Sequence, residues 1–91
     1  MNNEQRLEAI REKLQSHLAP QEIQLRDDSD QHIGHPGARD GRGHFSVRIV
    51  AAKFNGLAKL ARHRLIYAIL ADLMQTEIHA LSIEAIALDE I

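Results

Sequence analysis

Two stretches of alternating apolar and polar side chains, joined by a helical stretch, constrain the fold of this chain most. Alternation runs from His44 to Ala52 and again from Ile78 to Ile86, which is the period-two pattern of half-buried strands. The residues from Leu57 to Met74 include neither glycine nor proline and many good helix formers, so one long helix is expected there. Because that helix carries the chain back across the sheet, the two strands should be parallel, as in a βαβ unit.

The N-terminal part of the chain predicts a helix followed by a short strand. Asn2 or Asn3 can cap the helix. Apolar residues then recur at helical spacing until Pro20, which stops the helix near His17. The next segment, Glu22 to Arg26, alternates around two apolar residues and predicts the first strand of the sheet.

A glycine-rich segment, residues 27–43, separates the first two strands. It holds four of the five glycines and one of the two prolines, so we expect a long mobile loop. Loops of this length are uncommon in small domains unless they have a function. The chain is therefore predicted to be one α+β domain over residues 1–91 with the order αββαβ. Strands one and two should be antiparallel, strand three parallel to strand two, and both helices packed on one face of the three-stranded mixed sheet.

Composition excludes several classes of protein. The chain has no cysteine, so it cannot build a disulfide framework, a thiol nucleophile or a thiolate metal site alone. Its formal charge of −2 gives no overall basic character, which weakens the case for binding nucleic acid through net charge. The N-terminus lacks the pattern of a signal peptide, and no apolar run reaches membrane-spanning length, so we expect a cytoplasmic protein that does not bind membranes.

Histidines are the most suggestive chemical groups. The chain has six, and His32, His35 and His44 lie in or beside the glycine-rich segment. Neutral imidazole is a ligand for iron, zinc, copper and nickel, although two loop histidines are a weak signal and most such loops are simply solvated. His79 has the same parity as Leu81 in the last strand, so its ring should point toward the packed side. A half-buried histidine bonded to a backbone carbonyl is the competing interpretation.

Positive charges gather near the start of the long helix. Lys59, Arg62 and Arg64, with His63 among them, could contact phosphates, although such a cluster is normally a solvated surface. The aspartates of the glycine-rich segment lie where no fixed catalytic pair is expected. With no recognisable nucleophile–base or phosphate-binding motif, the sequence does not predict an enzyme.

The sequence resembles the BolA family, and the resemblance covers essentially the whole chain. It is carried by four blocks, namely Gly43-His44-Phe45, Phe54-Asn55-Gly56, Arg62-His63-Arg64 and Ile78-His79-Ala80-Leu81. The resemblance implies an αββαβ fold similar to class II KH domains. It also implies a monothiol glutaredoxin as partner, with a [2Fe-2S] cluster shared between the two proteins. The family's ligands map to His79 and to a histidine of the glycine-rich segment, best matched by His32, with His35 as a substitute.

The absence of cysteine fits such a shared centre. A [2Fe-2S] cluster takes four ligands, so two imidazoles supply at most half of them. A partner's cysteine and a bound thiol such as glutathione would have to supply the others. The isolated chain is therefore not expected to hold the cluster alone.

Two departures from the family pattern bear on function. The family's usual Thr-Pro-x-Glu-Trp segment is replaced by Ala87 to Ile91, and the GxxG loop with which KH domains clamp nucleic acid is absent. Family members have nevertheless been described as transcriptional regulators.

Two hypotheses follow from these observations. The first is a non-enzymatic adaptor for iron-sulfur trafficking or for iron and stress regulation. The second is a DNA-binding regulator that uses Lys59, Arg62, His63 and Arg64. The free protein is expected to be a monomer or a weak dimer.

Overall fold

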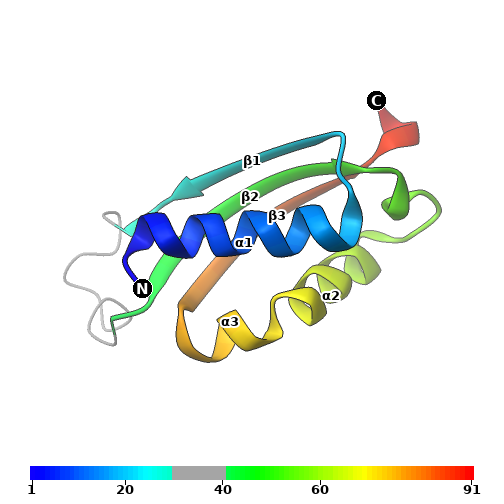
Figure 1. Cartoon of the computed structure of the whole chain (residues 1–91). Helices are drawn as coiled ribbons and strands as arrows, with labels where there is room; N and C mark the ends of the chain where they lie inside the picture. Colours follow the sequence, from blue (N-terminus) through cyan, green and yellow to red (C-terminus); the bar gives the residue numbers. More distant parts are fainter. Residues whose placement is uncertain (30–40) are drawn as a thin grey trace.

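A three-stranded mixed sheet organises the molecule. The computed structural model describes residues 1–29 and 41–91. The sheet has the order β1-β2-β3 and is built from β1 (Glu22–Asp27), β2 (Gly43–Ala51) and β3 (Ile78–Ala87). Figure 1 shows α1 (Asn3–Leu18), α2 (Lys59–Ile69) and α3 (Ala71–Thr76) on one side of this sheet. Two short 3₁₀ turns, Ala52–Phe54 and Leu88–Glu90, follow β2 and β3.

Strand pairing agrees with the predicted topology. β1 pairs antiparallel with β2, and β2 pairs parallel with β3. Leu25, Val47 and Ile83 lie opposite one another across the three strands and pack on the core side. The polar rows beside them alternate to the other side, as the period-two pattern requires. The predicted α+β class and the mixed sheet are thus confirmed.

The core fills the space between the sheet and the helices. Ile10 and Leu14 of α1, Ile49 of β2 and Ile66 of α2 are fully buried. Burying an aliphatic side chain of this size contributes about 1.5–3 kcal/mol. Because all the helices lie on one side, the other side of the sheet is left with polar rows.

Helix α1 begins and ends where local chemistry directs it. The Asn2 side chain accepts a hydrogen bond from the Gln5 backbone at 2.8 Å, and the Gln5 side chain accepts one from the Asn2 backbone at 2.9 Å. This reciprocal pair satisfies two amides that a helix start otherwise leaves without partners. At the other end, Ala19 takes a left-handed conformation with φ 43° directly before Pro20. The predicted start and end of this helix are confirmed to within one residue.

The prediction of one long second helix was wrong. The chain forms α2 and α3, which are separated at Leu70, with φ −96° and ψ 11°. Leu70 is fully buried, and its amide still donates to the Ile66 carbonyl at 3.0 Å. The break occurs without glycine or proline, at a side chain that is buried in the core, so we attribute it to packing rather than to local propensity.

A β-bulge opens strand β3. Gly43 lies opposite Ile78, but the next residue of β2, His44, lies opposite Ala80, so His79 is the extra residue of β3. An extra residue reverses the side-chain alternation on one side of a bulge. Ile78 and Leu81 are accordingly both buried, whereas His79 is exposed. The prediction that His79 points toward the packed side was therefore wrong.

Candidate functional site

The last residues of β1 and the first residues of β2 and β3 meet at one end of the sheet, which we call the histidine edge. Because β1 is antiparallel to β2 and β3 is parallel to it, the end of β1 lies beside the starts of β2 and β3. His44 and His79 are both at this edge. The residues that connect β1 to β2, which include His32 and His35, lie between Ser29 and Gly41 and outside the described residues.

A pair of imidazoles marks this edge. The ring centroids of His44 and His79 are 4.9 Å apart, and the ring planes are inclined by 42°. His44 is 7 % exposed, with both ring nitrogens buried, whereas His79 is exposed. Arg42 brings a guanidinium nitrogen, Nη2, to 3.2 Å from Nδ1 of His79. The bulge thus presents one accessible imidazole, backed by a buried one.

The backbone of His44 is held by the two residues that follow β1. The His44 amide donates to the Ser29 hydroxyl at 3.1 Å, and the His44 carbonyl accepts from the Asp28 amide at 2.7 Å. The sequence placed His44 at the start of a strand, beside the loop and in one of the family blocks, but did not predict its contact with His79. Its contact with His79 depends on strand register, which no local pattern encodes.

Asp28 is a buried carboxylate beside the same edge. It is 8 % exposed, and its carboxylate accepts from Arg26 Nε at 2.6 Å and from the Ser46 hydroxyl. The predicted mobile loop began at residue 27, but Asp27 ends β1 and Asp28 is packed against β2. Both carboxylate oxygens of this buried side chain therefore have a hydrogen-bond donor.

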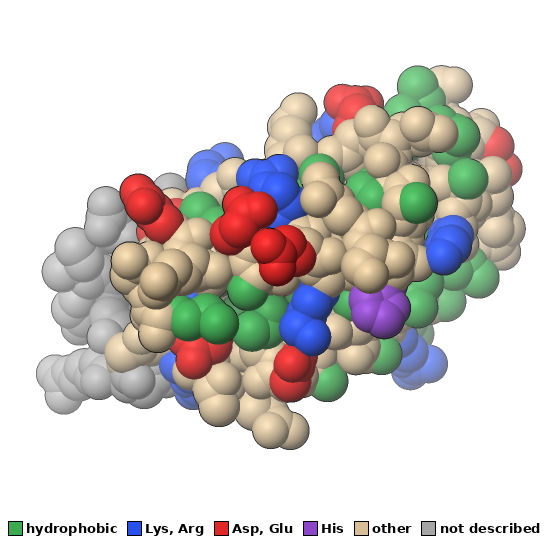
Figure 2. Space-filling model, viewed as in Figure 1, with side chains coloured by type: hydrophobic (Ala, Val, Ile, Leu, Met, Phe, Trp, Pro, Cys, Tyr) green, Lys and Arg blue, Asp and Glu red, His purple; other side chains and the backbone are tan. Residues whose placement is uncertain are grey.

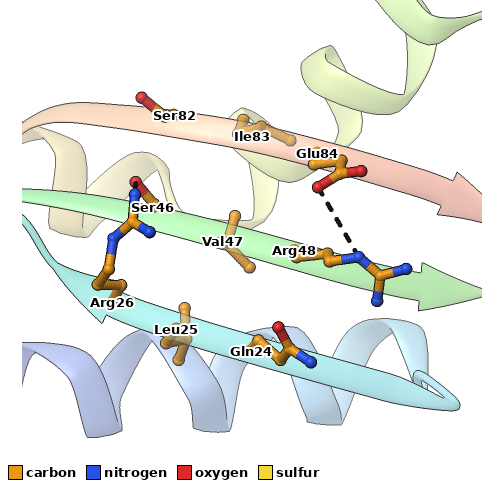
Figure 3. Close-up of a pocket in the computed structure, with 9 residues that line it drawn as sticks. All are labelled: Gln24, Leu25, Arg26, Ser46, Val47, Arg48, Ser82, Ile83 and Glu84. Carbon is orange, nitrogen blue, oxygen red and sulfur yellow. Dashed lines mark hydrogen bonds and ion pairs between the residues drawn. The ribbon is translucent and has the colours of Figure 1, made fainter.

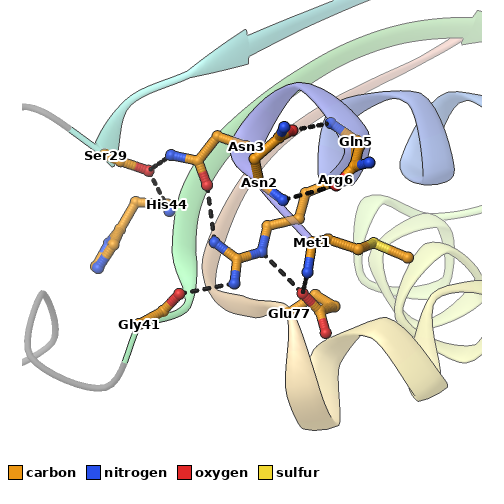
Figure 4. A network of polar contacts seen from close by, with 9 residues as sticks. All are labelled: Met1, Asn2, Asn3, Gln5, Arg6, Ser29, Gly41, His44 and Glu77. Carbon is orange, nitrogen blue, oxygen red and sulfur yellow. Dashed lines mark hydrogen bonds and ion pairs between the residues drawn. The ribbon is translucent and has the colours of Figure 1, made fainter.

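Arg6 connects α1 with two other segments near His44, as Figure 4 shows. Its guanidinium donates to the Glu77 carboxylate at 2.9 Å, to the Asn3 side chain at 2.9 Å and to the Gly41 carbonyl at 2.7 Å. Asn3 in turn donates to Ser29 at 3.3 Å. The Arg6 guanidinium, with a smaller effect from the N-terminal amine, lowers the pKa of Glu77. The first turn of α1 therefore holds Ser29 and Gly41, which flank segment 30–40, and also Glu77, which directly precedes β3.

The described residues do not form a complete metal site. Within residues 1–29 and 41–91, no three side chains of the His, Cys, Asp or Glu type lie close enough together to hold a metal ion. His79 is the predicted ligand that the structure describes, whereas His32 and His35 lie outside the described residues. At this end of the sheet the described residues offer one exposed imidazole, that of His79, so any metal centre here needs further ligands.

The predicted basic cluster separates into buried and exposed members. Lys59 and Arg64 are exposed and His63 is half-buried, but Arg62 is 6 % exposed. The Arg62 guanidinium donates to the carbonyls of Leu57 at 2.9 Å and Ala85 at 3.0 Å. It also donates to the Glu90 carboxylate at 2.6 Å, and it lowers the pKa of that carboxyl group. In this arrangement Arg62 is held inside the fold and is not presented to a phosphate.

Negative charges lie close to the remaining cations. The pocket beside α2 is lined by Lys59 and His63 but also by Glu84 and Glu90. On the helix side of the molecule, Figure 2 shows acidic side chains over α1, which carries the exposed Glu4, Glu8 and Glu12. The helix side is therefore mixed in charge and not uniformly basic.

The open side of the sheet carries a shallow pocket with paired charges (Figure 3). Arg48 lies 3.6 Å from the Glu22 carboxylate and 3.8 Å from the Glu84 carboxylate. Two hydroxyls, those of Ser46 and Ser82, line the same pocket. Exposed pairs of this kind contribute little to stability and leave this surface close to neutral. In the described part of the chain, no helix is long and apolar enough to cross a membrane.

The fold and the histidine edge together define the class of protein. It is a small α+β protein with its helices on one side of a mixed sheet and an exposed histidine at one end of that sheet. Residues 14–90 match the family model described as BolA-like protein. The chain therefore belongs to the BolA family, as its sequence blocks suggested.

Known relatives support this assignment. The chain is 45 % identical over 83 residues to Protein BOLA1, chloroplastic, of Arabidopsis thaliana, covering 88 % of this chain and 52 % of that protein. It is 35 % identical over 83 residues to the DNA-binding transcriptional regulator BolA of Vibrio cholerae, covering 91 % of this chain and 76 % of the regulator. The chain spans between 22 % and 54 % of the length of four of the curated relatives that it matches.

A solved structure gives the same fold. The BolA domain of SufE1 from Arabidopsis thaliana matches with a TM-score of 0.85 at 41 % sequence identity. The match covers 100 % of this chain and 99 % of that domain.

Proposed function

We propose that this chain is a non-enzymatic adaptor that binds a monothiol glutaredoxin and co-ligates a shared [2Fe-2S] cluster, in iron-sulfur trafficking or in iron and stress regulation. The observation that carries the proposal is the exposed imidazole of His79, held on a bulge at the edge of the sheet in a chain without cysteine. A ligand sealed in the core would exclude a shared centre. His79 is accessible instead.

The donor set fits a centre that is completed from outside. Imidazole replaces thiolate in some [2Fe-2S] centres, so His79 is a chemically suitable ligand. The described residues provide no three clustered donors, so this part of the chain is not built to hold a metal alone. The cysteine of a glutaredoxin and the thiol of its bound glutathione would supply the missing thiolates. A bound cluster of this kind supplies one-electron redox chemistry and an exchangeable cargo of iron and sulfide.

A second ligand from this chain would come from segment 30–40. His32 is the proposed ligand and His35 its substitute, as the family resemblance implies. The flanks of the segment are fastened by Asn3 and Arg6, through Ser29 and Gly41 respectively. These contacts tether both ends of the segment near His79, which supports a ligand pair drawn from the segment and from β3.

The test is anaerobic reconstitution with a monothiol glutaredoxin and glutathione, followed by visible absorption and circular dichroism. We expect His79→Ala to change the spectrum of the complex, because an imidazole ligand is lost. His17→Ala is the matched control, since His17 is an exposed histidine at the far end of α1. The single variants His32→Ala and His35→Ala identify the second ligand. Identical spectra for wild type and His79→Ala would remove His79 from the ligand set.

A DNA-binding regulator is the second candidate function, and the name of the Vibrio cholerae relative favours it. Lys59, His63 and Arg64 would contact the phosphates, with Arg62 shaping the surface from inside. Binding through these residues should weaken with salt, with a slope of about 0.9 per phosphate neutralised. Arg64→Ala should make that slope shallower in a gel-shift or anisotropy titration. Weak binding that does not depend on DNA sequence would eliminate this candidate.

Location and assembly stay predictions. The sequence suggests a cytoplasmic protein, whereas the Arabidopsis thaliana relative is named chloroplastic. We also propose that the free protein is a monomer or a weak dimer that acts without binding membranes.

A further inference from the structure

Arg42 contacts one of the two ring nitrogens of His79. Nη2 of Arg42, the residue directly before β2, lies 3.2 Å from Nδ1 of His79, the second residue of the neighbouring strand β3. A guanidinium has five N–H donors, no acceptor, and keeps its proton at any physiological pH. In this contact Nδ1 must therefore be the acceptor, and its lone pair points at Arg42.

A neutral imidazole has only one such lone pair. If Nδ1 accepts a hydrogen bond, Nε2 carries the ring proton. A metal ion binds through a ring nitrogen that has no proton. Binding at Nδ1 would take the lone pair that Arg42 uses. Binding at Nε2 would move the proton to Nδ1, where an N–H would then face the N–H groups of Arg42. In either case the guanidinium has to move away.

From this geometry we propose that Arg42 is a positioning residue that competes with metal for His79 and must release Nδ1 before His79 can act as a ligand. The inference rests on the proposed function of His79. It also suggests a property of the partner: a carboxylate or a thiolate beside the cluster would be a suitable acceptor for the displaced guanidinium. Anionic acceptors of this kind form the strongest hydrogen bonds with a guanidinium.

The backbone on both sides of Arg42 is held, so release requires only a side-chain movement. The Gly41 carbonyl accepts from Arg6 at 2.7 Å, and the Gly43 amide donates to the Glu77 carbonyl at 3.0 Å. Arg42 itself is half-buried, with its guanidinium at the surface beside the exposed His79 ring. Rotation about the side-chain bonds of Arg42 can therefore uncover Nδ1 without disturbing the sheet.

The test uses Zn²⁺ alone, without a partner, at a pH above the ordinary imidazole value of about 6.5. The affinity of the His79 ring for Zn²⁺ is followed by NMR in a background carrying His32→Ala and His35→Ala. We expect the Arg42→Met variant to bind Zn²⁺ about 3- to 10-fold more tightly than the same background with Arg42 intact. This is the range for loss of one competing hydrogen bond. The Nε2–H tautomer of His79 should also be less populated in Arg42→Met than in wild type.

Arg48→Met is the matched control for charge. It removes one positive charge, as Arg42→Met does, from the strand that directly follows Arg42, but it leaves the contact with His79 intact. We expect Arg48→Met to bind Zn²⁺ like wild type. The effect of Arg42→Met should also persist in high salt, because a hydrogen bond is not screened as a distant charge is. Equal affinities for wild type and Arg42→Met, or a difference that salt abolishes, would overturn the inference.

The outcome is separable from that of the proposed function. If Arg42→Met tightens Zn²⁺ binding but no variant forms a cluster with glutaredoxin, the competition stands and the proposed function fails. If a cluster forms through His79 while Arg42→Met leaves the Zn²⁺ affinity and the tautomer unchanged, the competition is excluded and the proposed function stands.

Discussion

At the scale of single residues, Gly43 shows how close packing supports the edge that carries the histidines. A Cβ atom built on Gly43 would overlap the ring of Phe45, which is buried in the core. The same residue lies at the bulge, directly opposite Ile78. The absence of a side chain therefore lets the Phe45 ring fill the core at the point where β3 gains its extra residue.

Gly43→Ala should destabilise the protein by about 1–3 kcal/mol, the usual cost of overpacking a core. The change is measured by urea unfolding. In a double-mutant cycle with Phe45→Leu, the cost of Gly43→Ala should fall, because the ring that blocks the new methyl group is gone. Strict additivity of the two substitutions would contradict the packing explanation.

Arg62 and Arg64 lie two residues apart in the same helix, but the first side chain is buried and the second is exposed. Arg62→Met should cost about 1–3 kcal/mol, since the carbonyls of Leu57 and Ala85 lose a buried donor. Arg64→Ala, on the exposed side of the same helix, should change stability by less than about 0.5 kcal/mol. Thermal and urea unfolding of the two variants make the comparison. Equal losses of stability in the two variants would show that the contacts of Arg62 with Ala85 and Glu90 do not stabilise the fold.

At the scale of elements, two ion pairs connect α1 with the segment that leads into β3. Arg6 bonds to Glu77 next to the histidine edge. Away from that edge, Nζ of Lys13 in α1 lies 3.0 Å from the carboxylate of Asp72 in α3. Both pairs join the same parts of the chain, but only Arg6 also holds Gly41. This gives a natural comparison between a contact at the candidate site and one away from it.

Arg6→Ala should speed hydrogen exchange of the Gly43 amide, which donates to the Glu77 carbonyl at 3.0 Å. The expected reason is that Glu77 and Gly41 lose their common partner, so the local opening of this edge becomes more frequent. Lys13→Ala should leave that amide at its wild-type exchange rate. If both variants exchange alike at Gly43, Arg6 does not hold the edge specifically.

At the scale of the whole molecule, three carboxylates make stability depend on pH. Each is paired with a cation from a distant element, and side-chain hydrogen bonds from Lys13, Arg6 and Arg62 lower the pKa values of Asp72, Glu77 and Glu90, respectively. A carboxyl group whose pKa is lower in the folded state binds fewer protons there than in the unfolded chain. Its contribution is complete above the unfolded value and is lost as the pH falls through the folded value.

We therefore expect stability to decrease with acid once the pH falls below the ordinary values of 3.8 for Asp72 and 4.5 for Glu77 and Glu90. Urea midpoints measured from neutral to acidic pH test this expectation. Substituting Lys13 and Arg6 by Met should flatten the dependence, because two of the lowered pKa values then return toward their ordinary values. A constant midpoint across this range would contradict the assigned ion pairs.

Local patterns were sufficient for most of the fold. The alternation around Val47 and Ile83 predicted two strands, and the asparagine before the first helix predicted its cap. These signals are carried by residues within one or two turns or a few strand positions of each other. The candidate site was predicted less completely: His79 was named, but its exposure and its contacts with His44 and Arg42 were not.

The sequence by itself determined the order of the elements, the pairing of the strands and the absence of thiolate ligands, because periodicity, capping and composition act locally or need no coordinates. Only the tertiary structure decided the break at Leu70, the bulge that turns His79 outward and the burial of Arg62. Each of these depends on residues that meet from distant parts of the chain, such as Gly43 with Ile78 and Arg62 with Ala85. Register and packing between such residues are set by the whole core and leave no signal in neighbouring positions.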